Sequence, residues 1–126
     1  MLIDVKVIPH NQQRYETVGD WYFNQDNNRL TIRVSSMRNR KYEFLVALHE
    51  QVEAMLCLER GICEKEITLF DMKFEAARED GNTDEPGDDP AAPYKREHFF
   101  ATSVERLMAS ELGVDWRLYE EAVNSL

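Results

Sequence analysis

Alternating apolar and polar positions near the start of the chain predict β-strands. Residues 2–8 and 29–35 each carry aliphatic side chains at every second position, which is typical of a strand with one buried face. An aromatic run predicts a further strand over residues 17–23. Only the turn-forming cluster 24–28 separates the last two strands, so they should form a hairpin. We therefore expect an antiparallel sheet of about three strands, in which the N-terminal strand joins this hairpin.

The remainder of the chain predicts four helices that cover one face of the sheet. Their expected ranges are 41–60, 64–78, 95–112 and 116–124. Gly61 and Gly113 stand where a glycine commonly ends a helix. The apolar face expected for the first helix consists of Leu45, Leu48, Val52, Met55 and Leu56. The chain should therefore form a single α+β domain, with a sheet in residues 2–35 and a helical part in residues 41–125.

Residues 80–93 break the helical pattern. This segment holds three prolines and several acidic residues, a composition typical of a loop. We expect it to be either a mobile loop or a lid over a site. Its acids Asp84, Glu85, Asp88 and Asp89 do not have the spacing of a calcium-binding EF-hand, so a solvated loop is the favoured interpretation.

Composition limits the function classes. The 126 residues carry a net charge of -9, and so acidic a surface disfavours binding to nucleic acid. No apolar run is long enough for a membrane helix, and the N-terminus alternates like a strand rather than a secretory signal. We expect a cytoplasmic protein with an unknown protein or peptide partner. Its two cysteines, Cys57 and Cys63, are expected to be reduced and mostly buried.

One helical stretch indicates chemistry. In the run His49-Glu50-Gln51-Val52-Glu53, His49 and Glu53 are four residues apart and share one helix face. An imidazole and a carboxylate at this spacing can hold one divalent cation. The adjacent Glu50 can take a proton from a water bound to that cation. Charged groups within an apolar stretch cost free energy to bury, so their presence here indicates a partner or a function.

A metal site needs a further ligand, and the helix expected over 95–112 offers one. His98, Ala101 and Glu105 share a face of that helix. His98 is the expected ligand, and Glu105 is expected as another ligand or as a hydrogen-bonding partner of a ligand. Glu97 is a weaker candidate. The alternative is that these side chains are ordinary surface or structural residues.

The stretch from Phe44 to Leu56 resembles the active-site helix of small zincin-like proteins, whose motif is His-Glu-x-x-His. A hairpin that precedes the helix by a short connection adds to this resemblance, which covers residues 17–60. It implies a zincin-like core in which His49 and Glu53 are metal ligands and Glu50 is the general base. Glu53 replaces the second histidine of the motif. This replacement favours metal binding over proteolysis, and it makes iron, manganese or calcium easier alternatives to zinc.

Most of the chain also resembles uncharacterised proteins encoded by bacteriophages and prophages. The segments that carry this resemblance are Ala47–Glu50, Gly87–His98 and Leu112–Trp116. It implies a bacterial or phage cytoplasmic setting and no particular activity. The leading expectation is a divalent-metal-binding domain that acts as a metal-dependent hydrolase. The alternative is a non-catalytic interaction or structural domain without metal.

Overall fold

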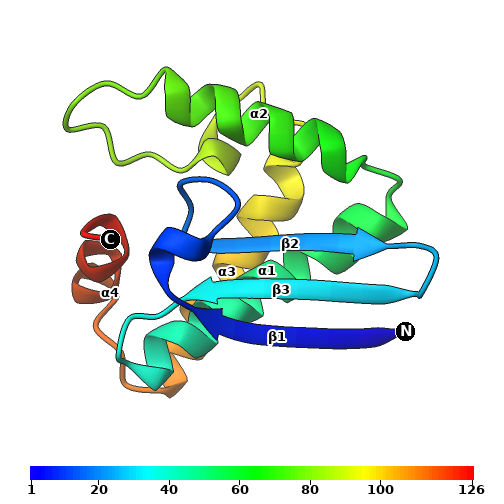
Figure 1. Ribbon diagram of the computed structural model, residues 1–126. Helices are drawn as coiled ribbons and strands as arrows, with labels where there is room; N and C mark the ends of the chain where they lie inside the picture. The colour runs from blue at the N-terminus through cyan, green and yellow to red at the C-terminus, as the bar shows by residue number, and fades with distance from the viewer.

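The computed structural model describes residues 1–126 as a three-stranded sheet with four α-helices (Figure 1). The predicted element ranges agree with the structure to within about two residues at each end. The strands are β1 (Leu2–Ile8), β2 (Gly19–Asn24) and β3 (Arg29–Ser35). The helices are α1 (Arg40–Glu59), α2 (Glu64–Ala76), α3 (Lys95–Glu111) and α4 (Trp116–Asn124), with short 3-10 helices η1 (His10–Gln12) and η2 (Pro86–Asp88).

The sheet is mixed, so the prediction of an antiparallel sheet is wrong for β1. The strand order is β1-β3-β2; β2 pairs antiparallel with β3 in the predicted hairpin, whereas β1 pairs parallel with β3. Residues 9–18 lead from the end of β1 past the central position to the start of β2. The hairpin then places β3 between β1 and β2, where it runs parallel to β1.

The central strand β3 is the most buried of the three. Leu30, Ile32 and Val34 are at most 1% exposed, and they form the middle of the hydrophobic core. A strand with a neighbour on each side and helices on one face removes its apolar side chains from water most completely. Opposite Ile32, the β2 residue Trp21 points to the same side and is also buried.

Helices α1 and α3 lie against one another behind the sheet in the view of Figure 1, while α2 runs along the β2 side and α4 closes one end. Helix α1 begins at a polar cap, in which the Asn39 side chain accepts hydrogen bonds from the N–H groups of Lys41 and Tyr42. Its buried side differs from the predicted stripe, because Met55 is 38% exposed and His49 and Glu53 are buried in its place. Cys57 is buried as expected, but Cys63 is exposed.

The segment 80–93 folds back onto the helices. Its helix η2 contacts both α2 and α3, and Gly87 within it is buried. This loop therefore borders the face of α3 that carries His98. No helix of the structure combines the length and the apolar character needed to cross a membrane.

The cap of α1 gives a stability prediction. Asn39→Ala removes the oxygen that accepts from two otherwise unpaired N–H groups, so the free energy of unfolding should fall by about 1 kcal/mol. Urea denaturation followed by circular dichroism measures this change. Asn27→Ala, in the exposed turn of the hairpin, is the control; equal losses for the two variants would contradict the capping role.

Candidate metal centre

Two buried histidines face each other where α1 packs against α3. His49 on α1 is 7% exposed and His98 on α3 is 5% exposed, and Glu53, one turn beyond His49, is 5% exposed. The helical spacing places His49 and Glu53 on the same buried side of α1. The packing of α3 then brings His98 onto that pair, 49 residues away from His49 in the chain.

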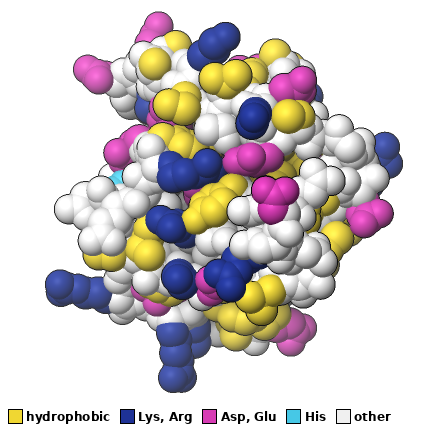
Figure 2. All heavy atoms as spheres, turned by 45° about the vertical axis from the view of Figure 1, so that its right-hand side comes forward, with side chains coloured by type: hydrophobic (Ala, Val, Ile, Leu, Met, Phe, Trp, Pro, Cys, Tyr) yellow, Lys and Arg dark blue, Asp and Glu magenta, His cyan; other side chains and the backbone are white.

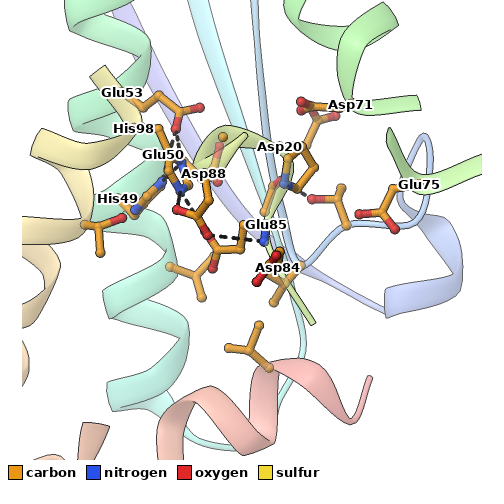
Figure 3. Close-up of a pocket in the computed structure, with 18 of the residues that line it drawn as sticks. Asp20, His49, Glu50, Glu53, Asp71, Glu75, Asp84, Glu85, Asp88 and His98 are labelled. Atoms are coloured by element: carbon orange, nitrogen blue, oxygen red, sulfur yellow. Dashed lines mark hydrogen bonds and ion pairs between the residues drawn. The ribbon is translucent and has the colours of Figure 1, made fainter. Parts of the chain in front are cut away.

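Three ligand atoms converge at this contact (Figure 3). His49 Nε2 lies 3.2 Å from His98 Nδ1 and 3.1 Å from Glu53 Oε2, and His98 Nδ1 lies 3.0 Å from the same Glu53 oxygen. Tetrahedral zinc ligands, with bonds near 2.0–2.1 Å, are roughly 3.3–3.4 Å apart. The observed triangle is only a few tenths of an ångström tighter, so these residues can hold a metal ion.

The protonation of the two rings decides what the triangle holds. His49 Nε2 and His98 Nδ1 both lie within hydrogen-bond distance of Glu53 Oε2, at 3.1 and 3.0 Å. When these nitrogens carry protons, both rings donate to that oxygen. When they do not, their lone pairs converge beside a buried carboxylate, an arrangement that a cation stabilises.

The outward nitrogen of His49 is also engaged. His49 Nδ1 lies 2.8 Å from Glu105 Oε1, and the hydroxyl of Tyr119 donates a hydrogen bond to the other Glu105 oxygen. Metal-binding histidines usually donate their second ring N–H to a carboxylate, which fixes the ring and its tautomer. Glu105 thus fits the predicted role of a hydrogen-bonding partner, and its contact is with the ring of His49 rather than with the triangle.

The outward nitrogen of His98 faces the loop. His98 Nε2 lies 2.9 Å from Glu85 Oε2 and 3.3 Å from Asp88 Oδ1, which is ion-pairing distance without the alignment of a hydrogen bond. Gly87 allows this approach, because a Cβ at that position would lie 2.3 Å from the imidazole. Both histidines therefore turn one nitrogen toward the triangle and the other toward carboxylates.

The surrounding charges shift the pKa values of the cluster. Burial works to lower the pKa of His98, but Asp88, Glu53 and Glu85 outweigh it and raise that pKa to about 12. Burial works to raise the pKa of Glu53, yet His49 and His98 hold it at about 2. The indole N–H of Trp21 donates to the remaining Glu53 oxygen at 3.2 Å. Glu53 is therefore a carboxylate with donors or ring nitrogens on both oxygens.

Glu50 is the acid without a partner. Its carboxylate makes no hydrogen bond or ion pair within the chain, although it lines the cavity beside the triad (Figure 3). A Cβ on Gly19 would lie 2.7 Å from Glu50 Oε1, so the absence of a side chain on β2 leaves room for it. Burial, together with the nearby Glu53, raises the pKa of Glu50 well above its usual range.

The cavity itself is acidic and has a volume of about 590 Å³. Opposite the triad it is lined by Asp20 and Asp71 (Figure 3). Asp20 is paired with Arg14 at 2.6 Å, and Asp71 accepts hydrogen bonds from the hydroxyls of Tyr15 and Tyr94. Carboxylates gathered in one cavity favour a cationic ligand over an anionic one.

The structure brings the predicted site residues together, with roles that differ among them. His49, Glu53 and His98 form the triangle, Glu50 lies beside it, and Glu105 holds the ring of His49. Glu97 points elsewhere and pairs with Arg60.

The sequence did not reveal several contributors to the site, namely Trp21, Glu85, Gly87, Asp88 and Tyr119. The loop spacing predicts that Glu85 and Asp88 are solvated; both are exposed, but the structure also places them against His98. The sequence does contain Gly87-Asp88 between two prolines, with Asp88 ten residues before His98. This pattern does not reveal toward which helix the loop folds.

We found no match to this chain among protein-family models, curated proteins or solved structures.

The buried acid opposite the triad gives a prediction about pH. Burial raises the pKa of Asp71 from 3.8 to about 7, although Tyr94 and Tyr15 donate hydrogen bonds that oppose the rise. The folded protein thus keeps a proton that the unfolded chain loses near pH 4. Stability contributed by Asp71 is present at acidic pH and falls as pH rises toward 7.

The variant Asp71→Asn cannot ionise and should lack this dependence. With metal removed by a chelator, wild type should lose a few kcal/mol of unfolding free energy relative to this variant between about pH 4 and 7. Urea denaturation across that range measures the difference. Asp26→Asn, on the exposed hairpin turn, is the control. Parallel pH profiles for wild type and Asp71→Asn would contradict the assignment.

Proposed function

We propose that this chain is a divalent-metal-binding domain whose ion is held by His49 Nε2, His98 Nδ1 and Glu53 Oε2. The observation that carries the proposal is the buried triangle of these atoms, with sides of 3.0–3.2 Å. Two imidazoles and a carboxylate suit zinc, and they also accept iron or manganese.

The orientation of both rings supports the same proposal. Glu105 fixes His49 from behind, and Glu85 with Asp88 faces the back of His98. Carboxylates in these places raise the basicity of the ligating nitrogens and hold the rings in position.

We further propose that the domain is a metal-dependent hydrolase related to small zincins. Three protein ligands leave a coordination position for water, as in catalytic zinc sites. A bound divalent ion lowers the pKa of that water. Glu50 lies beside the triad with its carboxylate free of other partners, which suits a general base. The cavity provides the space for a substrate.

We also propose that the protein acts inside a bacterial cell. The resemblance to proteins of bacteriophages and prophages supports a function in the cytoplasm of a bacterial host. The acidic cavity favours substrates that carry positive or neutral groups near the scissile bond over phosphorylated ones.

Metal analysis tests the binding proposal. After incubation with zinc and desalting, wild-type protein should retain about one ion per chain, as measured by inductively coupled plasma mass spectrometry. His49→Ala and His98→Ala should retain none. His10→Ala is the matched control, because the third histidine of the chain bonds with Ser35 and Glu16 instead.

A graded series of acids sharpens this test. Zinc affinity should fall more than about 100-fold in Glu53→Gln, which loses a ligand, and about 10- to 100-fold in Glu105→Gln, which loses a ring partner. Glu97→Gln, equally buried on α3 but paired with Arg60, is the control. Circular dichroism verifies that each variant is folded. Wild-type protein without stoichiometric metal after supply of zinc, iron or manganese would overturn the proposal.

Glu50→Gln separates catalysis from binding. The amide cannot accept a proton but occupies the same space, so zinc content should match wild type while hydrolysis falls by about 100-fold or more. Unfolded casein, a fluorogenic peptide library and a nitrophenyl ester are suitable substrates. Glu64→Gln, which lines the edge of the same cavity, is the control.

The outcomes of this experiment are distinct. Zinc-loaded wild type that hydrolyses none of these substrates, or Glu50→Gln that hydrolyses them as fast as wild type, would contradict the catalytic role. The metal-binding proposal would stand in either case.

A further inference from the structure

Strand β1 is the outer strand of the sheet on one side, since it pairs only with β3. In Figure 1 it is the lowest strand, and no other strand lies beyond it. An outer strand presents unpaired N–H and C=O groups along its free edge, where another strand can add. The chemistry of β1 indicates which strand fits there.

Alternate residues of β1 direct their backbone N–H and C=O groups to opposite sides of the strand. Leu2 donates its N–H to Asn28 and Ile8 accepts from Ser36, so the even-numbered residues bond toward the β3 side. In a parallel ladder the intervening residues point their N–H and C=O groups the other way. Ile3, Val5 and Val7 therefore direct these groups to the free edge.

The same three residues carry exposed apolar side chains. Ile3, Val5 and Val7 are 42–51% exposed, although their side chains lie on the face that the helices cover elsewhere. Figure 2 shows hydrophobic side chains near the lower edge of the molecule, with charged side chains beside them. An apolar row beside an unpaired backbone edge indicates a partner strand rather than solvent.

We propose that β1 pairs antiparallel with β1 of a second copy of this chain, with the twofold axis at Val5. In this register Ile3 faces Val7 of the other copy, and Val5 faces its own counterpart. All three then occupy hydrogen-bonded positions, because their N–H and C=O groups point to the free edge. On the opposite face Asp4 lies across from Lys6, twice by symmetry. The strand is therefore complementary to itself in backbone, apolar contacts and charge.

Charge also excludes the neighbouring registers. A shift of the axis to residue 4 places Asp4 across from Asp4, and a shift to residue 6 places Lys6 across from Lys6. Like charges directly opposite one another destabilise a strand pair. Within one chain Asp4 and Lys6 already lie on the same face, with Lys6 Nζ 3.7 Å from Asp4 Oδ2. In the pair of strands each of these groups attracts its counterpart in the other copy instead. The product is one continuous six-stranded sheet of twofold symmetry.

Sedimentation analysis of the whole chain tests the pairing. Across a concentration series from micromolar to millimolar, wild-type protein should shift from the mass of one 14.8 kDa chain to twice that mass. Asp4→Lys or Lys6→Asp alone creates like-charge pairs and should raise the dissociation constant by about ten-fold. The double variant Asp4→Lys/Lys6→Asp exchanges the charges and should restore dimerisation.

Backbone pairing has its own variant. Val5→Pro removes an N–H that points to the free edge and leaves the β1–β3 hydrogen bonds intact, so it should give a monomer. Arg117→Asp/Glu121→Lys, an exchange within an exposed ion pair on α4, is the matched control and should dimerise as wild type. Circular dichroism spectra that match wild type show that the variants are folded.

Three results would contradict the proposed pairing of β1 strands. Wild-type protein that remains monomeric throughout the series would overturn the proposal. So would a dimer that persists in Val5→Pro, or a double charge variant no better than the single ones, since another surface or another partner strand would then be in use.

Discussion

The structure depends on one unusual contact, the meeting of two imidazoles and a carboxylate inside the helical layer. His49, His98 and Glu53 occupy interior positions that apolar side chains would otherwise take. Burying such groups costs free energy unless each polar atom has a partner. The surroundings supply those partners from separate elements: Trp21 comes from the sheet, Glu105 from α3, and the acids Glu85 and Asp88 from the loop around η2. The packing of α1 on α3 is therefore specified by polar contacts as well as by the apolar core.

The acidic character of the cavity follows from the same contact. Around the triad, carboxylates outnumber the basic groups that could neutralise them, and Glu50 has no partner of its own. Such an assembly stabilises any cation that enters and is itself stabilised by it. Binding of a metal to the folded state alone would raise the free energy of unfolding by mass action. Fold stability would then rise with occupancy of the site.

The sequence predicted those features that depend on local periodicity. Helical spacing placed His49 with Glu53, and His98 with Glu105, on common faces, and both pairs lie on buried faces in the structure. Alternation likewise located β1 and β3, and an aromatic run located β2. The parallel pairing of β1 could not be read from periodicity, because it depends on which strand takes the centre of the sheet. The roles of Glu85 and Asp88 depend on the path of a loop, and loop paths are set by tertiary contacts such as that of Gly87 with His98.

The contact between Gly87 and the ring of His98 has an evolutionary consequence. Any larger residue at position 87 would claim space that the imidazole fills. Apart from Ala92, the rest of the segment 80–93 is mostly exposed, and exposed loop positions tolerate change. Selection should therefore act more strongly on position 87 than on the loop positions that contact neither His98 nor the core, because this glycine and a histidine eleven residues later depend on one another.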